Sequence, residues 1–187
     1  MARVFVITGP SGVGKGTLIR GLLERVPELA LSVSATTRAP RKAETDGVDY
    51  HFLTDEQFER HVRAGDFVEH ADYAGRRYGT LRQELQRRVD AGVPLVLEIE
   101  VQGARQVRET LPEAVRVFIA PPSPEALRAR LTGRGTDDPD VVERRLDVAR
   151  GELEAKSEFK HVVVNDRLDD ALDELVAIVR KELADAA

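Results

Sequence analysis

The sequence predicts an α/β fold in which a parallel β-sheet is flanked by helices and carries a small inserted mixed lobe. Short apolar segments alternate with helical patterns along most of the chain, which is typical of parallel strands joined by right-handed crossovers. A glycine-rich turn follows the first apolar segment and opens a helix. From residue 34 to about residue 81 the pattern changes to short strands and turns around one helix, which indicates the inserted lobe.

The core elements follow from apolar periodicity. The first helix begins at about Lys15 and carries an apolar stripe through Leu18, Leu22 and Val26, with Pro27 just beyond its end. Proline near the start of a helix predicts two further helices, which begin at about residues 124 and 139. The other core elements are expected as strands at residues 3–8, 29–34, 95–100, 116–120 and 161–164, and as helices at residues 81–91, 103–110 and 168–183.

The lobe has weaker signals, because its strands are short. Strand patterns occur at residues 50–52, at residues 67–69 and around Tyr78. A helix is expected to begin at Thr54, with Gln57 placed to complete a capping box.

The turn after the first strand has the spacing of a phosphate-binding loop. Gly9, Gly14 and Lys15 match the required pattern, and glycines allow successive backbone N–H groups to point at one anion. The helix that begins there adds positive potential, and Lys15 adds a full charge. We therefore expect a nucleoside triphosphate site formed by Gly9, Pro10, Ser11, Gly12, Val13, Gly14, Lys15, Gly16 and Thr17. Because the hydroxyl stands at Thr17 and not directly after the lysine, the usual argument for a magnesium ligand does not transfer directly.

Composition excludes several classes of protein. The net charge of −5 argues against a general nucleic-acid binder, and the chain has no cysteine for disulfides or thiolate metal sites. No apolar segment approaches the roughly 20 residues that span a membrane. The first strand follows Met1 and Ala2 almost directly, so we expect no signal peptide and a cytoplasmic protein.

Carboxylates and arginines mark candidate positions for chemistry. Glu98 and Glu100 stand two apart near the end of a predicted strand, so they should project to the same side, at the edge where parallel sheets bind ligands. Guanidinium groups match phosphate oxygens two hydrogen bonds at a time. Three pairs of arginines stand out in the sequence: Arg38 with Arg41, Arg130 with Arg134, and Arg144 with Arg145.

Along nearly its whole length the chain resembles the guanylate kinase family. The resemblance rests on residues 9–17, 34–41, 46–52, 69, 78–80, 98–103, 134–136 and 164–166, in this order and spacing. It implies a P-loop NTPase-type core at residues 1–33, 84–122 and 158–187. It also implies a GMP-binding lobe at residues 34–83 and a helical lid at residues 123–157.

The resemblance implies how GMP is bound. Glu69 would accept hydrogen bonds from N1–H and the 2-amino group of guanine, an adjacent donor pair that adenine lacks. Ser34 and Thr80 would complete the contacts to the base. The residues implied around the GMP phosphate and at the margin of its site are Arg38, Arg41, Tyr50, Tyr78, Glu98 and Glu100. The family commonly has aspartate where this chain has Glu100, and the extra methylene moves the carboxylate.

The resemblance also implies the catalytic groups. Lys15, Arg38, Arg130, Arg134 and Arg145 would surround the transferring phosphoryl group, whose transition state is stabilised mainly by alignment and positive charge. Asn165 would contact the adenine of ATP. Magnesium would arrive with ATP and be held mainly through phosphates and water, without a metal cluster of the protein's own.

Two alternatives remain at this point. One is a non-catalytic module that resembles guanylate kinases and binds phosphopeptides; the intact Lys15 argues against it. The other is a kinase for a different nucleoside monophosphate, against which Glu69 argues. ATP and GMP are the expected small-molecule partners, and no nucleic acid, membrane or obligate protein partner is expected.

Overall fold

The core of the protein is a parallel β-sheet whose strands come from distant parts of the chain. The computed structural model describes residues 3–73, 75–132 and 139–186. Within these residues five strands form the sheet in the order β2-β7-β1-β8-β9, and every neighbouring pair is parallel. The strands are β1 (Val4–Thr8), β2 (Ala30–Leu31), β7 (Leu95–Glu98), β8 (Val115–Ala120) and β9 (His161–Val164). Parallel pairing explains why these strands are continuous apolar segments, since both faces are covered.

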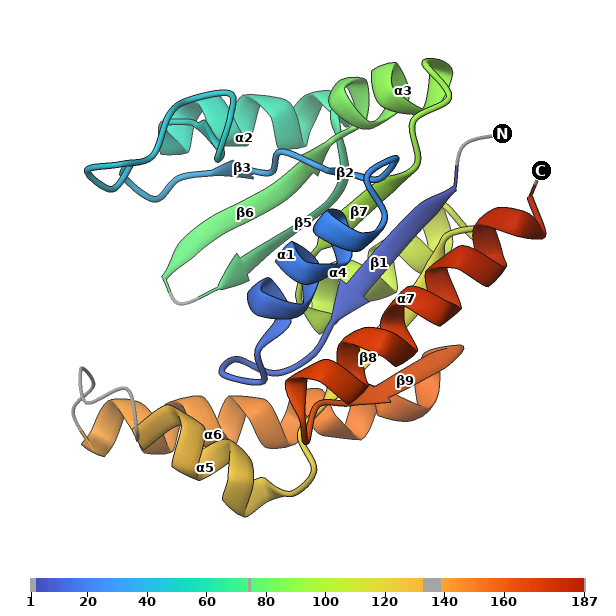
Figure 1. The fold of residues 1–187 in the computed structure, drawn as a ribbon. Coiled ribbons are helices and arrows are strands. Elements are labelled where there is room, and N and C mark those ends of the chain that lie inside the picture. The colour runs from blue at the N-terminus through green and yellow to red at the C-terminus, as the bar shows by residue number, and fades with distance from the viewer. Residues whose placement is uncertain (1–2, 74, 133–138, 187) are drawn as a thin grey trace.

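Helices cover both faces of this sheet (Figure 1). On one face, α1 and α7 pack side by side, burying Leu18 and Leu22 of α1 with Leu175 and Val179 of α7. On the other face, Val107 of α4 packs with buried residues of β7 and β8 and of helix α3. The bounds are α1 (Lys15–Arg25), α3 (Arg82–Asp90), α4 (Val101–Thr110) and α7 (Leu168–Ala184).

The residues predicted as an inserted lobe form a second, mixed sheet. Its order is β4-β3-β6-β5, with β3 and β4 parallel and the other pairs antiparallel. Helix α2 packs on it through Phe58, whose ring stacks on Phe67 with centroids 4.5 Å apart. The expected capping box of α2, between Thr54 and Gln57, is present. The bounds are β3 (Ala35–Thr36), β4 (His51–Phe52), β5 (Phe67–Tyr73), β6 (Arg76–Leu81) and α2 (Asp55–Ala64).

Two helices lie on the side of the β1–α1 loop that is opposite to the second sheet (Figure 1). Helices α5 (Pro124–Thr132) and α6 (Pro139–Glu154) pack together through a small apolar cluster, and the short 3₁₀ helix η1 (Ala155–Glu158) follows them. The guanidinium of Arg128 on α5 pairs with Glu143 on α6. Figure 1 shows the second sheet and this helical pair on either side of the β1–α1 loop. Within the described residues, no helix is long and apolar enough to cross a membrane.

Two expected boundaries were wrong. Residues 29–34 were expected to form one strand, but Ser32 N–H bonds to Val96 in the first sheet, whereas the Ser34 carbonyl accepts from His51 in the second. This segment therefore passes from one sheet to the other. The strand expected at residues 95–100 ends at Glu98, because the Glu100 carboxylate caps α4 by accepting from the N–H groups of Gln102 and Gly103, both at 2.6 Å.

Candidate active site

The β1–α1 loop has the geometry that its glycines predict. A side chain at Gly9 would overlap the carbonyl oxygen of Ile119, so the loop lies directly against β8. Gly14 has φ 96° and caps α1, a conformation that favours glycine. The Lys15 ammonium turns back over the loop, donating to the Gly9 carbonyl at 2.5 Å and the Pro10 carbonyl at 3.2 Å. The positive charge is thus held at the helix N-terminus, where an anion binds best.

Asn165 supports this loop from beneath. The residue is 6% exposed, and its side-chain amide donates to the Val13 carbonyl at 2.8 Å. A side chain at Gly14 would stand 2.7 Å from the same amide nitrogen. The fully buried Val13 and Asn165 therefore fix the loop on the core. The predicted contact of Asn165 with adenine stays a prediction.

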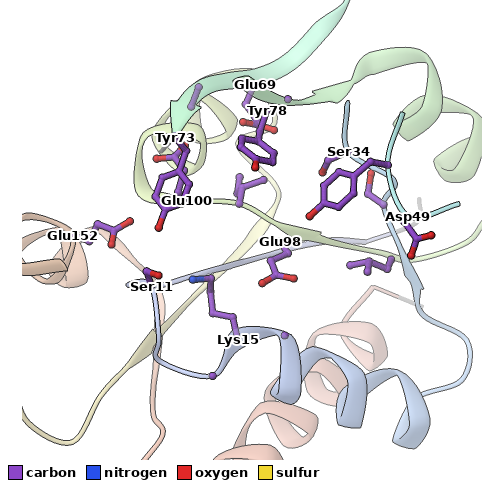
Figure 2. Close-up of a pocket in the computed structure, with 18 of the residues that line it drawn as sticks. Ser11, Lys15, Ser34, Asp49, Glu69, Tyr73, Tyr78, Glu98, Glu100 and Glu152 are labelled. Atoms are coloured by element: carbon purple, nitrogen blue, oxygen red, sulfur yellow. The ribbon is translucent and has the colours of Figure 1, made fainter. Parts of the chain in front are cut away.

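A single cavity of about 480 Å³ joins the loop to the second sheet. Figure 2 shows Lys15 on one side of this cavity and Glu69 and Tyr78 on the other, with Glu98 between them and Glu152 at one end. The predicted site residues that line it are Ser11, Gly12, Gly14, Lys15, Gly16, Thr17, Ser34, Tyr50, Glu69, Tyr78, Glu98 and Glu100. The structure thus brings the predicted ATP loop and the predicted GMP residues to one cavity.

Other predicted residues lie around this cavity without lining it. Gly9, Pro10, Val13 and Asn165 form the back of the loop, and Thr80 lies behind Glu69. Four arginines also lie outside the lining: Arg38, Arg41, Arg130 and Arg145. Arg134 falls outside the described residues.

Glu69 is the most deeply buried carboxylate of the cavity. Its side chain comes from β5, is 4% exposed, and accepts a hydrogen bond from the fully buried Thr80 hydroxyl at 2.7 Å. Burial raises the pKa of Glu69 to about 7; the charge of Glu100 adds to this effect, and the Thr80 bond opposes it. A carboxylate held in this way has a strong need for further donors, such as two adjacent N–H groups of a ligand.

Lys15 is surrounded by the other carboxylates of the cavity. Burial lowers the pKa of Lys15, and the charges of Glu98, Glu152 and Glu100 oppose that shift. Burial within the cavity raises the pKa of all three glutamates. This includes Glu98, although its side chain is partly accessible to water. The Lys15 ammonium therefore stands among several carboxylates. A polyphosphate that binds with its cation would change the net charge around it.

The paired arginines of the second lobe are organised by a residue that the sequence prediction missed. The Nη1 and Nη2 atoms of Arg38 both donate to the Glu44 carboxylate, each at 2.9 Å, and the Arg41 backbone N–H donates to the same carboxylate at 2.7 Å. The Arg38 guanidinium also lies 5.2 Å from the ring centroid of Tyr50, which lines the cavity. The Arg41 side chain is 78% exposed, and its Nη1 lies 3.9 Å from the same Glu44 carboxylate. Glu44 thus fixes the arginine loop beside the cavity.

One arginine of α5 and one of α6 contact the core beside the phosphate loop. Arg130 donates to the backbone carbonyls of Asn165 at 2.8 Å and Asp166 at 3.2 Å, while its Nη1 is buried without a hydrogen-bond partner among the described residues. Arg145 donates to the Ser11 hydroxyl at 2.7 Å. These contacts hold two charged side chains at the edge of the phosphate loop.

Glu152 is a second site residue that the sequence prediction missed. It comes from α6, is 9% exposed, lines the cavity, and keeps its Oε2 atom without a hydrogen-bond partner among the described residues. Glu152 stands seven positions after Arg145, which places both on one helix face. This spacing from Arg145 is the sequence signal from which Glu152 could have been predicted as a site residue. Tyr73 and Asp49 also line the cavity; Asp49 falls within the matched segment 46–52 but was given no role, and no motif included Tyr73.

The donors near Lys15 suit a magnesium ion that arrives with its phosphates. Thr17 lines the cavity, and a side chain added at Gly16 would meet nothing within 4 Å. No cluster of three or more metal-binding side chains occurs among the residues that the structure describes. Magnesium is usually held by substrate phosphates, water and only one or two protein oxygens, and a site with few protein oxygen donors is compatible with that mode of binding.

Together, a phosphate loop at the carboxyl edge of a parallel sheet and a second lobe facing it across one cavity define a P-loop phosphotransferase. The family model described as guanylate kinase matches residues 1–182. Guanylate kinase from Frankia casuarinae is 57% identical over 93% of this chain and 95% of its own length, and that from Synechococcus sp. is 55% identical over 94% and 92%. The chain belongs to the guanylate kinase family.

Comparison of structures agrees with this membership. The crystal structure of guanylate kinase from Anaplasma phagocytophilum superposes with a TM-score of 0.78 at 36% identity, covering 97% of this chain and 86% of that one. A sugar kinase from Janibacter sp. superposes with a TM-score of 0.55 at 20% identity, covering 95% and 94%, which reflects a shared fold alone.

Proposed function

We propose that this protein is a guanylate kinase that transfers the γ-phosphoryl group of ATP to the phosphate of GMP. The bond between the γ-phosphorus and the β–γ bridging oxygen breaks, a bond to a GMP phosphate oxygen forms, and ADP and GDP result. The observation that carries the proposal is the single cavity lined by both Lys15 of the phosphate loop and Glu69 of the second sheet. Direct transfer needs both substrates held close together in one cavity.

On the acceptor side, Glu69 would read the base. Its ionised carboxylate accepts from the guanine N1–H and 2-amino group, while Thr80 holds it in place and Ser34 adds a further contact. Adenine offers no such donor pair, so its binding would leave a buried carboxylate without partners, which costs affinity. Tyr50 and Tyr78 line the same cavity at the side of Arg38, where the GMP phosphate would lie.

On the donor side, the loop N–H groups and Lys15 would bind the ATP phosphates. Magnesium, when bound with ATP through phosphates, water and the Thr17 hydroxyl, would supply positive charge to the polyphosphate. Arg130 and Arg145 already stand at the loop edge and would add guanidinium groups around the transferring phosphoryl. The predicted role of Arg134 in the same group is part of this proposal.

The proposed division of labour follows the parts of the fold. Residues 34–83 would bind GMP, residues 123–157 would close over ATP, and the remaining residues would form the core. Closure would exclude water, which would otherwise take the phosphoryl group. dGMP would serve as well as GMP in this scheme, because no proposed contact uses the ribose 2′-hydroxyl. The cytoplasm, where both nucleotides are made and used, is the proposed location.

Coupled measurement of ADP formation tests this function. With ATP and magnesium, we expect rapid turnover with GMP and dGMP and very slow turnover with AMP, CMP and UMP. Efficient use of AMP would leave the phosphate loop in place and refute the role of Glu69. Absence of turnover with every acceptor, in folded protein, would refute the enzyme and favour a phosphopeptide-binding module.

A further inference from the structure

Gly103, at the start of α4, lies directly against the carboxylate of Glu69. A methyl group at this position would overlap Glu69 Oε2 and would stand 3.2 Å from Glu69 Cδ and 3.1 Å from Glu100 Oε1. Gly103 is buried, and its backbone is helical, without a positive φ. Because Gly103 has no side chain, it leaves room for the Glu69 carboxylate.

Local helix energetics do not explain a glycine here. Glycine inside a helix is less stable than alanine, because it loses more conformational freedom on folding. Gly103 also gives no special N–H: its amide donates to Glu100 at 2.6 Å, which any residue except proline can do. The residue is unfavourable for the helix, and the closest contact that an added side chain would make here is with the Glu69 carboxylate.

Glu69 has little freedom to move away from an added methyl group. Its Oε1 atom is held by the Thr80 hydroxyl at 2.7 Å, and both residues are almost fully buried. On the helix side, Glu100 fixes the backbone of Gly103 through the cap. A methyl group would therefore push the carboxylate toward the cavity and change the position of Oε2, the oxygen that it would overlap.

We propose that Gly103 is a positioning residue for guanine recognition, because its missing side chain sets the depth and angle of the Glu69 carboxylate. This inference rests on the proposed role of Glu69 as the base reader. Gly103 touches no substrate in this account and acts through Glu69, the side chain that an added methyl group would overlap. Glu69 lies across the cavity from Lys15 (Figure 2), so we expect a displaced Glu69 carboxylate to change GMP binding and to leave ATP binding largely unaffected.

Gly103→Ala tests the proposal, with Gly151→Ala as the matched control. Gly151 is also a helical glycine, but an added methyl group there meets nothing within 4 Å. We expect Gly103→Ala to raise the KM for GMP by roughly tenfold, the loss of about one hydrogen bond, with the KM for ATP unchanged. Gly151→Ala should leave both values unchanged.

The same substitution in two Glu69 variants separates positioning from simple crowding. Aspartate is one methylene shorter and can withdraw from the added methyl group, so Gly103→Ala should cost much less in the Glu69→Asp background. In the Glu69→Gln background, whose base contact is already broken, it should change the KM for GMP little. A Gly103→Ala protein that fails to fold, or that loses affinity for ATP and GMP alike, would overturn the proposal.

The single variants Glu69→Gln and Gly103→Ala distinguish a failure of this inference from a failure of the proposed function. If Glu69→Gln leaves GMP kinetics unchanged, the proposed base reader is wrong and the inference falls with it. If Glu69→Gln impairs GMP use but Gly103→Ala behaves like Gly151→Ala, the proposed function stands and the positioning role of Gly103 is refuted.

Discussion

Glu69→Gln should weaken GMP use and at the same time stabilise the folded protein at neutral pH. The carboxylate is 4% exposed, and burial raises its pKa from 4.5 to about 7. The folded protein therefore resists ionising this group, whereas the unfolded chain ionises it freely. A raised folded-state pKa gives stability that is present below pH 4.5 and is lost as pH rises to about 7.

The size of this effect follows from the two pKa values. The difference between 4.5 and about 7 is 2.5, which corresponds to about 3 kcal/mol of unfolding free energy lost between acid and pH 8. Glutamine has the same shape and no charge, and its carbonyl can still accept from Thr80. We therefore expect the variant to be more stable than the wild type by up to about 3 kcal/mol at pH 8 and nearly equal to it at pH 4.5.

Kinetics should move in the opposite direction. The glutamine amide would present N–H groups to the donors of guanine, costing about 1–3 kcal/mol, or roughly tenfold to a hundredfold in kcat/KM for GMP. In the wild type, kcat/KM should also fall as pH drops below 7, because protonated Glu69 accepts one hydrogen bond fewer. The GMP phosphate itself titrates near pH 6, so the Glu69→Gln profile is the reference against which this dependence is measured.

Urea unfolding at several pH values and initial rates over the same range test both parts. Equal pH dependence of stability in the two proteins would refute a buried Glu69 that keeps its proton up to about pH 7. Unchanged kcat/KM for GMP, in a variant with the expected gain of stability, would refute Glu69 as the base reader and leave the pKa argument in place.

Three further substitutions probe other parts of the account. Lys15→Ala should lower kcat by roughly a hundredfold or more, since it removes a charge from the transition state, and circular dichroism should show an intact fold; near-normal turnover would exclude the phosphate-loop role. Glu44→Gln should free Arg38 and raise the KM for GMP by about tenfold, leaving the KM for ATP unchanged, and an equal rise for both substrates would argue for general loosening. Phe58→Ala should cost about 3–5 kcal/mol where its ring stacks on Phe67, and hydrogen exchange should rise in the second sheet before the first; simultaneous exchange of both sheets would contradict an independent lobe.

Much of the fold and the loop could be predicted because their causes are local in the sequence. The glycine spacing around Lys15, the capping box at Thr54 and the alternation of apolar strands with helices are all set by neighbouring residues. Glu98 and Glu100 both line the cavity, but the strand geometry from which this was expected does not hold for Glu100, which caps α4 after the strand has ended. The resemblance to a family then supplied the roles that spacing alone does not define.

The remaining features depend on contacts between distant segments. The Arg38–Glu44 fork forms inside a loop whose path no periodicity describes. Glu152 enters the cavity only because α6 folds back onto the phosphate loop. Asn165 lies beneath Val13 because β9 ends beside the loop, 152 positions away in sequence. Such positions are fixed by tertiary packing, which single-sequence patterns do not carry.

A crystal structure of the complex with GMP and a non-hydrolysable ATP analogue tests the central claim most directly. We expect guanine against Glu69 and Thr80, the GMP phosphate beside Tyr50 and Tyr78, and the triphosphate on the Lys15 loop in the same cavity. GMP bound outside this cavity, or within it with its base turned away from Glu69, would contradict the account.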